Sequence, residues 1–570
     1  MKHDSASASA LARRLFRRLR AGALAIVVAS PTLAGTLAFA GSVPACLGSI
    51  GGPADDDATN QASSRSDDDG SSAAGTTLGG SSGVVPLGKA GAGGNVCSAP
   101  VALAPLDGAA RVGDGNPDTC TEAALRTAFV AGGTIAFDCG AAPITITVTS
   151  PLISPEDVVL DGENNITISG GGTTRIFEGT TGKKMTLQRL TVRDGFANDT
   201  KGAGALHTNW RSMLTVIDCR FLDNVGIGGN TERAGGAIST HDSKTVILNS
   251  TFEGNRGRLG SALNILLSDA EIINSTIQKN TLEEEGFGGA IFIDGAGIED
   301  KVPGDPNAGF RGVGSIRVCG SLIAENDGAQ AHGAGGIYYC GYDDNSALID
   351  RTTIVDNVTK DRGGAVNANC NGRVRVDAST LARNRATYGG AVSVDCTDDA
   401  CKGDNPEART LITRSTLVEN DASVEGGIGG AIMAWSALDL VGVTVARNRG
   451  YYGGALSGAA KVRATDTIFA DNQIANPYNS YKSCGGSLRS AAGVLEWPAV
   501  VADDYNAPCS PGGPTGDPKI GPLADNGGPT QTCALGDGSA ALGLGTTCNE
   551  PDQRGTPRST PCDLGAWASP

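Results

Sequence analysis

The sequence predicts an all-β protein, a parallel β-solenoid with a short N-terminal capping helix, and two observations support this fold class. First, residues 202–472 repeat one short phrase about nine times, and a repeat of roughly 20 to 50 residues is typical of solenoids. Second, apolar residues within the repeats alternate with others, as at Val246, Leu248 and Phe252, which is the period of a strand. A coil of three short strands plus turns fits a repeat of this length.

Each repeat opens with a glycine pair and closes with an apolar residue three places before an asparagine. The clearest openings are Gly235-Gly236, Gly288-Gly289, Gly363-Gly364, Gly389-Gly390, Gly429-Gly430 and Gly453-Gly454. The nine asparagines, 24 to 46 residues apart, are Asn224, Asn255, Asn280, Asn326, Asn357, Asn384, Asn420, Asn448 and Asn472. Glycines allow positive φ and close backbone approach, and stacked asparagines can form a ladder of amide hydrogen bonds. We therefore expect both groups at turns of the solenoid.

These coupled Gly-Gly-Ala-Ile and Phe-x-x-Asn phrases resemble the polymorphic outer-membrane protein repeat over about half of the chain. The resemblance implies a single-stranded right-handed parallel β-helix, of the pectin-lyase-like kind, on a bacterial surface. Residues 119–177 also resemble the entry coils of pectate-lyase-like β-helix proteins. We assign residues 97–199 to the N-terminal cap and first coils, and residues 200–475 to the repeats.

Residues 1–45 have the composition of an export signal. Five arginines precede the apolar run Ala21–Ala40, which ends in Ala-Phe-Ala. Two processing routes stay open: cleavage after Ala40, or a lipoprotein signal in which Cys46 is acylated and tethers the protein to the outer membrane. Cleavage after Ala40 would release a secreted protein that begins at Gly41.

The charge of the exported part is strongly negative. Residues 1–45 carry six basic groups and one acidic group, which leaves the remainder at −16 − 5 = −21. So acidic a protein is a poor candidate for binding nucleic acid. Residues 46–96 are rich in Gly, Ser, Ala and Asp, and we interpret them as a disordered acidic linker.

The cap region holds a predicted helix and a weak metal motif. Thr119-x-x-Glu122 is a capping box that leads into a helix over Ala123–Ala131, which would cover the open end of the first coil. Asp114, Asn116 and Asp118 imitate the start of a calcium loop, but no glutamate follows at the required place, so we favour a turn. Apart from this calcium motif, the sequence indicates no cofactor.

The chain has fifteen cysteines, and fourteen remain if Cys46 is acylated. An even number is what disulfide pairing requires, so the count suggests disulfides in an oxidising compartment. Candidate disulfides join Cys120 with Cys139, Cys396 with Cys401, and Cys484 with Cys509. Cys396 could instead pair with Cys370 on the adjacent coil. Insertions at Asp294–Gly312 and Asp395–Arg409 are predicted loops, and we expect them to contact a partner.

Residues 476–570 resemble the choice-of-anchor Q domain that follows β-helix repeats in bacterial surface proteins. The motifs include Asp525-Asn526-Gly527-Gly528-Pro529 and Cys562-Asp563-Leu564-Gly565. The charged residues Asp552, Arg554, Arg558 and Asp563 could be catalytic, but a buried network of ion pairs and turns is the favoured interpretation. No anchoring tail follows in this sequence, which adds weight to Cys46.

Two function classes remain. We favour a non-catalytic structural or adhesion protein, monomeric, that binds a protein or polysaccharide ligand at the outer membrane or as a secreted product. The alternative is a β-helical polysaccharide lyase or glycoside hydrolase, which fold analogy permits. No motif for an acid–base pair, a nucleophile or a zinc site appears in the sequence. A groove lined by two carboxylates and a basic residue on one face would favour the enzyme.

Overall fold

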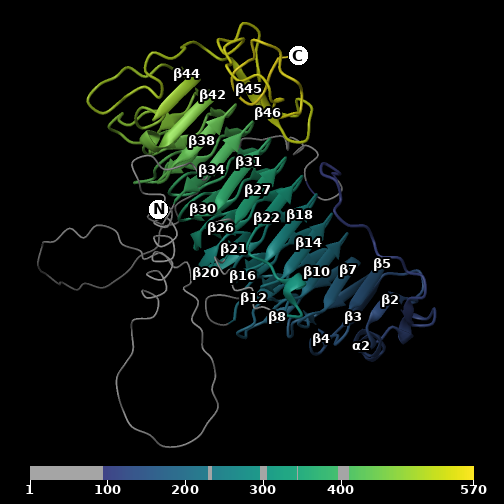
Figure 1. Cartoon of the computed structure of the whole chain (residues 1–570). Helices are drawn as coiled ribbons and strands as arrows, with labels where there is room; N and C mark the ends of the chain where they lie inside the picture. Colours follow the sequence, from purple (N-terminus) through teal and green to yellow (C-terminus); the bar gives the residue numbers. More distant parts are fainter. Residues whose placement is uncertain are drawn as a thin grey trace, which may run out of the picture. The chain divides into compact units, whose positions relative to one another are not determined.

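The computed structural model describes residues 91, 94–228, 234–295, 305–342, 345–395 and 410–569. These residues belong to one compact unit, Gly48–Pro570, and form a right-handed parallel β-helix, so the predicted fold class is confirmed. Figure 1 shows the strands stacked in chain order, from β2 at the purple end to β44 at the yellow-green end. The helices in the described residues are α2 (Glu122–Ala131) and the 3-10 helices η1 (Pro117–Thr119), η2 (Ala308–Phe310) and η4 (Ala459–Lys461).

The largest sheet runs the length of the solenoid, and all its pairings are parallel. Its strands are β1 (Ala110–Val112), β2 (Gly133–Phe137), β3 (Ile144–Thr147), β5 (Val158–Ser169), β7 (Lys184–Arg193), β10 (Met213–Ile217), β11 (Arg220–Leu222), β14 (Lys244–Leu248), β15 (Thr251–Glu253), β18 (Asp269–Ile273), β19 (Thr276–Gln278), β22 (Ile316–Cys319), β23 (Leu322–Ala324), β27 (Ser346–Asp350), β28 (Thr353–Val355), β31 (Arg373–Asp377), β32 (Thr380–Ala382), β34 (Thr410–Thr413), β35 (Thr416–Val418), β38 (Leu438–Val441), β39 (Thr444–Ala446), β42 (Val462–Ala470) and β44 (Ser490–Trp497).

Shorter strands complete the coils. One sheet holds β4 (Leu152–Ile153), β6 (Phe177–Glu178), β9 (Leu206–His207), β13 (Ile238–His241), β17 (Leu263–Leu266), β21 (Ile291–Asp294), β26 (Ile337–Gly341), β30 (Val366–Cys370), β33 (Val392–Val394), β37 (Ile432–Ala434) and β41 (Leu456–Ser457). Two more hold β8 (Phe196–Ala197), β12 (Val225–Gly226), β16 (Arg256–Leu259), β20 (Thr281–Gly288), β24 (Asp327–Gly328), β25 (His332–Gly333) and β29 (Val358–Thr359), and then β36 (Asp421–Ala422), β40 (Arg449–Gly450) and β43 (Gln473–Ile474). The hairpin β45 (Ile520–Ala524) and β46 (Thr532–Leu535) is antiparallel.

One repeat can make four short strands, one more than the three that its length suggests. In one coil these are β13, β14, β15 and β16, because the alternating segment bends between β14 and β15. The bend is at Asn249, whose φ is 48°, and Asp218, Asn274 and Arg351 hold the same place in other coils with φ of 52°, 47° and 44°. Asn and Asp tolerate this left-handed conformation better than other side chains do. Glycine is therefore not the sole source of positive φ in the coils.

In five of the six clearest glycine pairs the first glycine has positive φ and differs in role from the second, which Gly389 and Gly390 illustrate. Gly389 has a φ of 68°, a conformation that disfavours a side chain. Gly390 lies so close to the next coil that a Cβ atom would be 2.1 Å from the carbonyl oxygen of Gly430. The first glycine allows the turn, and the second allows the coils to stack.

The nine asparagines of the repeats form one continuous ladder from Asn224 to Asn472, and all of them except the half-buried Asn472 are buried. The side-chain amide of each donates to the Oδ1 of the next, for example from Asn357 to Asn384 at 3.0 Å. The same Oδ1 accepts the backbone N–H of the preceding asparagine, at 3.1 Å for this pair. Each asparagine therefore meets the polar groups of a turn that is closed to water.

A second ladder is made of hydroxyl groups. It lies five places before the asparagine in most repeats, where the sequence shows only that small residues recur. The Oγ of Ser275 accepts the backbone N–H of Ser250 at 3.1 Å and donates to the carbonyl of Ile273 at 2.9 Å. Ser321, Thr352, Ser379 and Ser415 repeat this pattern. These side chains are selected for a hydroxyl group as well as for small size.

Helix α2 covers the first coil, with Leu125 and Phe129 fully buried and the Phe129 ring 5.7 Å from that of Phe177. The predicted capping residue was wrong. Thr121, not Thr119, caps the helix, and its hydroxyl accepts from the N–H of Ala124 at 3.2 Å. Thr119 ends η1, because Pro117 starts a separate 3-10 turn before the helix.

Two segments cover the outer side of the large sheet. Residues 94–104, which we call the strap, are fixed by paired hydrogen bonds between Cys97 and Asn274, at 2.9 and 2.8 Å. Residues 517–569, which we call the clasp, place Leu523, Leu535 and Leu564 against outward-facing residues of β28, β35 and β39 such as Val355 and Val418. Strap and clasp leave part of the sheet open between them.

Candidate functional site

The candidate site is a groove of about 540 Å³ between the strap and the clasp. Its floor is the bend in the large sheet on three successive coils. Asp350 and Asp377 end β27 and β31, Arg351 follows β27, and Arg414 follows β34. Strap residues 94–96 form one wall, and clasp residues 528–529 and 552–555 form the other. Asp350 and Asp377 are register partners in the parallel pair β27–β31, so they lie side by side.

Every carboxylate on the floor of this groove is bonded to a guanidinium group. Asp350 pairs with Arg351 at 2.7 Å, and Asp377 pairs with Arg414 at 2.5 Å and with Arg375 at 3.0 Å. Burial alone would raise the pKa of Asp377, but hydrogen bonds from Arg414 and from Thr413 hold the pKa below its ordinary value of 3.8. The bond to Asp377 also raises the pKa of Arg414.

This arrangement favours recognition over proton transfer. A general base needs a lone pair that substrate can reach and a pKa near the working pH. Asp377 instead accepts hydrogen bonds from Arg414 and Thr413, and its pKa is low. Among the described residues that line the groove, none is a lysine, histidine or tyrosine.

The four charged residues predicted near the C-terminus are brought together as a structural network. Asp552 is fully buried and accepts from Arg554 Nε at 2.8 Å and from the N–H groups of Thr556 and Ala568. Arg558 donates to the carbonyls of Asp563 and Gly565 at 2.8 and 2.7 Å. Burial lowers the pKa of Arg558. Asp552 and Arg554 reach the groove wall, and the network as a whole holds the clasp in shape.

The weak calcium candidates Asp114, Asn116 and Asp118 lie in a turn. Asp114 accepts from the hydroxyl of Thr119 at 2.9 Å, and the side chain of Asn116 accepts from the N–H of Asp118 at 3.1 Å. These oxygens serve the backbone of η1, so the turn interpretation accounts for the motif.

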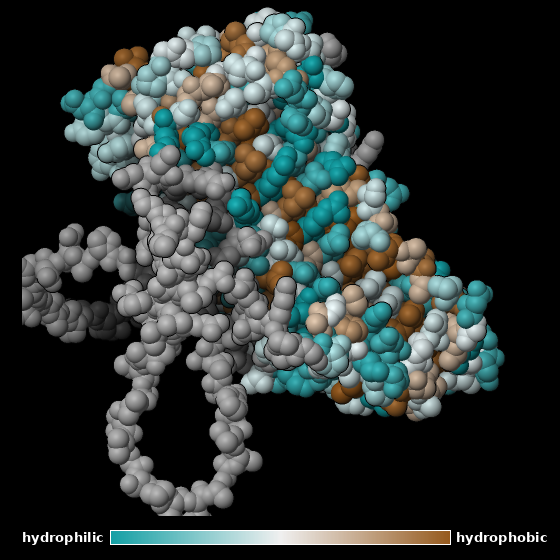
Figure 2. Space-filling view, in the orientation of Figure 1, coloured by the Kyte–Doolittle hydropathy of each residue, from teal (hydrophilic) through white to brown (hydrophobic). Residues whose placement is uncertain are grey.

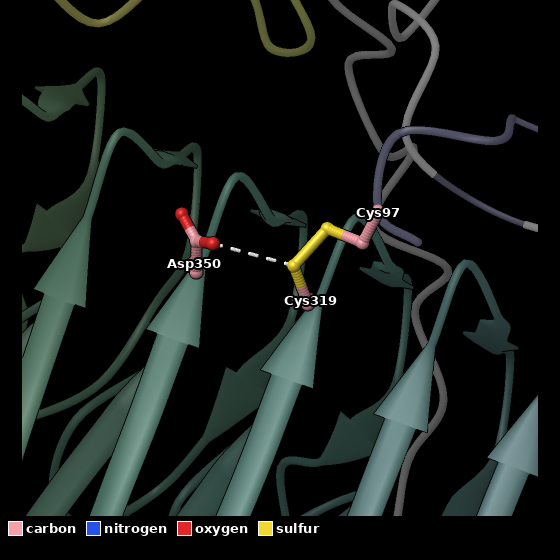
Figure 3. Close-up of side chains that lie close together, drawn as sticks. All are labelled: Cys97, Cys319 and Asp350. Carbon is pink, nitrogen blue, oxygen red and sulfur yellow. Dashed lines mark hydrogen bonds between the residues drawn. A yellow bond between two sulfur atoms is a disulfide. The ribbon is translucent and has the colours of Figure 1, made fainter. Parts of the chain in front are cut away.

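A different cluster brings two sulfur atoms beside a carboxylate. Figure 3 shows the disulfide between Cys97 and Cys319 with Asp350 next to it, 3.3 Å from the sulfur of Cys319. Metal binding by cysteine needs a thiolate, and a disulfide has none. The cluster is therefore a covalent link between the strap and β22, at the edge of the groove.

Four disulfides join pairs of described cysteines: Cys97–Cys319, Cys120–Cys139, Cys484–Cys509 and Cys548–Cys562. The second and third are pairs that the sequence suggested. Cys340 is also disulfide-bonded. Cys46, Cys396 and Cys401 lie outside the described residues, as do most of the two predicted loops and the acidic linker.

The groove itself was missed by sequence reasoning, although one signal was present. Asp350 and Asp377 each stand two residues before a member of the hydroxyl ladder, Thr352 and Ser379. Residues at equal offsets in successive repeats must form a column. The covering segments could not be placed, because the bond from Cys97 to Cys319 spans 222 residues.

The fold and its disulfides define an exported right-handed parallel β-helix protein, because disulfides persist in oxidising compartments. No α-helix in the described part of the chain has the length and apolar composition that a membrane crossing requires. Figure 2 shows hydrophilic and hydrophobic residues interleaved on the face of the coils that it presents.

Two solved structures are similar to this chain. The periplasmic alginate epimerase AlgG has a TM-score of 0.34 and 12% sequence identity, and the match covers 62% of this chain and 76% of that one. A mutant of the same epimerase has a TM-score of 0.29 and 12% identity, with coverage of 64% and 76%. No protein-family model and no curated protein matches the sequence. The resemblances to the outer-membrane repeat and to the choice-of-anchor Q domain therefore rest on their motifs alone.

Proposed function

We propose that this protein is a non-catalytic binding protein, displayed on the bacterial surface or secreted, whose rigid solenoid presents side chains to an extracellular ligand. The groove carries this proposal. It is the place where carboxylates of adjacent coils converge, and there Asp350, Asp377 and Asp552 are each bonded to an arginine of the same chain. Charges held in this way can recognise a ligand, but they are poorly suited to transfer protons.

The test is retention of the full-length exported protein on its own cells and on polysaccharide isolated from their envelope, measured by co-sedimentation. We expect saturable sedimentation with both materials, and none with beads that carry no polysaccharide. Protein that stays in the supernatant with cells and with the isolated material would contradict a binding role. Mass spectrometry of the mature N-terminus then separates a tethered protein, acylated at Cys46, from a released protein that begins at Gly41.

A second candidate function is a polysaccharide lyase or hydrolase, and one observation favours it. The groove meets the criterion of two carboxylates and a basic residue on one face, with Asp350, Asp377 and Arg414. Incubation with a panel of polyuronates and neutral polysaccharides checks this function through new reducing ends or unsaturated products. We expect no product. Product that the wild type makes and Asp377→Asn does not make would establish the enzyme and remove the binding proposal.

A further inference from the structure

Aromatic residues are rare in this chain, yet many of them gather on one edge of the C-terminal coils. Phe, Trp and Tyr make up 4% of the sequence, with nine tyrosines in total. Tyr338 and Tyr339 are fully buried in the core. Six of the other tyrosines, together with Trp435, fall between residues 388 and 505 at or near the solvent: Tyr388, Tyr451, Tyr452, Tyr478, Tyr481 and Tyr505.

Four of these tyrosines form a column, because they occupy the same turn of the coils, with one coil that has Ile428 in place of a tyrosine. Tyr388 and Tyr452 precede glycine pairs, and each bridges to Ile428 on the coil between them. The N–H of Gly453 donates to the carbonyl of Tyr481 at 2.8 Å, and the N–H of Tyr481 donates to that of Tyr505 at 3.2 Å. We call Tyr388, Tyr452, Tyr481 and Tyr505 the tyrosine column. Its four coil steps span roughly 19 Å at the usual spacing of strands.

Two rings of the column are exposed, the rings of Tyr388 and Tyr452 are half-buried, and neighbouring rings support them. Tyr481 is 45% exposed and Tyr505 is 66% exposed. The ring of Tyr452 lies 5.7 Å from that of Tyr481 and 4.9 Å from that of Tyr451, close to perpendicular in both cases. Such edge-to-face contacts fix the positions of the rings. Rings held in place lose little freedom when a ligand binds.

The first ring of the column is fixed by a cation. The guanidinium of Arg362 lies 6.0 Å from the ring centre of Tyr388 and 5.8 Å from that of Trp435, which is 40% exposed. Arg362 also pairs with Asp395 at 2.9 Å. Its charge is therefore neutralised within the protein, and it positions the two rings without attracting an anion.

From this geometry we infer that the tyrosine column is a binding platform for an extended, uncharged pyranose polysaccharide. Large exposed aromatic groups are costly in water, and a contiguous set of them marks an interaction surface. A pyranose ring has an apolar face of C–H groups that packs on an aromatic ring, while its hydroxyls meet polar groups at the rim. A line of rings along the solenoid matches a linear polymer of repeating rings. The net charge of −16 disfavours a polyanion.

The inference rests on the proposed binding function, and it is tested by titrating the full-length protein with cellohexaose, mannohexaose and hexagalacturonate in a calorimeter. We expect binding of a neutral hexasaccharide and none of hexagalacturonate. The double variant Tyr452→Ala, Tyr481→Ala should bind at least about tenfold more weakly, because truncation of rings that anchor a ligand removes most of the affinity. Tyr452→Phe keeps the ring and should stay within about threefold of the wild type.

The control is Trp210→Ala, which removes an exposed aromatic group that stacks on His241 elsewhere in the solenoid and should leave affinity unchanged. Unchanged circular dichroism spectra and melting temperatures verify that all variants are folded. Three calorimetric results would overturn the inference: no binding of either neutral hexasaccharide, equal affinity of the double variant, or tighter binding of hexagalacturonate. If one of these results is found and the wild-type protein still sediments with cells, the binding function stands and the tyrosine column is not its site. Retention that protease treatment of the cells abolishes would point to a protein ligand and also overturn the platform.

Discussion

At the scale of single residues, the solenoid keeps polar side chains inside because they stand in columns. Asn357 donates to Asn384 and accepts from Asn326. In the hydroxyl ladder, Ser275 likewise accepts from the backbone N–H of Ser250 on the neighbouring coil. A buried amide or hydroxyl without a partner would cost about 1–3 kcal/mol. The repeated phrase in the sequence is therefore a repeated solution to hydrogen bonding at turns. Glycine at the second position of each pair then brings coils close enough for the ladders to form.

The glycine role gives a first prediction, for Gly390→Ala. A Cβ atom there would meet the carbonyl oxygen of Gly430 at 2.1 Å, so the coils must separate locally. We expect the free energy of unfolding to fall by about 1–3 kcal/mol or more in chemical denaturation. Gly309→Ala is the control, because its Cβ would meet no atom within 4 Å, and it should change stability by less than about 0.5 kcal/mol. Equal effects at the two positions would contradict close stacking at Gly390.

A second prediction concerns Asp377 and pH. The folded-state pKa of this carboxyl is lower than 3.8, because bonds from Arg414 and Thr413 outweigh the effect of burial. A lowered pKa contributes stability that is complete above the unfolded value and is lost as pH falls through the folded value. Asp377→Asn should therefore be less stable than the wild type by about 3 kcal/mol at pH 7, because it removes the buried partner of Arg414 and leaves only the exposed Glu550, 3.8 Å away. The difference should shrink steadily between about pH 5 and pH 2.

The control for this pair is Asp356→Asn, which removes a more exposed pair with Arg383 on a nearby turn. Exposed pairs contribute roughly 0–1 kcal/mol, so its denaturation midpoint should stay close to that of the wild type at every pH. A constant difference between Asp377→Asn and the wild type from pH 7 to pH 2 would show that the stabilising role of Asp377 does not depend on its charge.

The sequence identified the residues whose partners repeat at a fixed offset and missed those whose partners do not. The nine asparagines were found because each stands three places after an apolar residue, as Asn384 does after Leu381. Positive φ was assigned to glycine, whereas Asn249 and Arg351 also adopt it, because nothing in a single residue type marks a bend. Thr119 was chosen as a helix cap because the spacing to Glu122 fits a capping box, and Pro117 shifted the helix start.

At the scale of elements, the strap and the clasp turn a plain solenoid into a molecule with a groove. The strap is tied to β22 by the disulfide between Cys97 and Cys319, and the clasp is tied to β35 through Gln553, which accepts from Thr416 at 2.7 Å. Both cover outward-facing apolar residues of the large sheet, which would otherwise meet water. The positions of the strap and the clasp could not be predicted from periodicity, because each segment contacts coils that lie far from it in the sequence.

The strap gives a third prediction, for the double variant Cys97→Ala, Cys319→Ala. Removal of a native disulfide typically costs 2–5 kcal/mol, and the loss grows with the length of the closed loop. This loop spans 222 residues, whereas that of Cys120 and Cys139 spans 19. We therefore expect the first double variant to lose about 2 kcal/mol more in denaturation than Cys120→Ala, Cys139→Ala does. Limited proteolysis should also cut it within residues 94–104.

Contrary results are easy to recognise in this comparison. One contrary result is a larger loss of unfolding free energy in Cys120→Ala, Cys139→Ala than in Cys97→Ala, Cys319→Ala. Another is a strap that resists protease equally well in the variant and in the wild type. Either result would show that the strap does not depend on its covalent link. The hydrogen bonds between Cys97 and Asn274 would then be sufficient to hold it.

At the scale of the whole molecule, the sequence is acidic, and the described residues form a scaffold of repeated coils in which the charged groups of the groove are paired and a column of tyrosines follows one edge. The sequence established the fold, because a repeat of fixed polarity has few alternatives to a solenoid. It did not establish the site, because a groove and a column depend on which turns meet in space. Tyr452 and Tyr481 precede different residues in the sequence, and only the coil register aligns them.

The central claim is that the protein binds a neutral polysaccharide and leaves it chemically unchanged. The most direct measurement is a proton NMR spectrum of a mixture of cellohexaose and mannohexaose, recorded with and without the full-length protein over several hours. The account predicts broadened sugar resonances that recover when an excess of free ligand is added, and no new signals. Sharp resonances throughout, or new anomeric signals that grow with time, would contradict it.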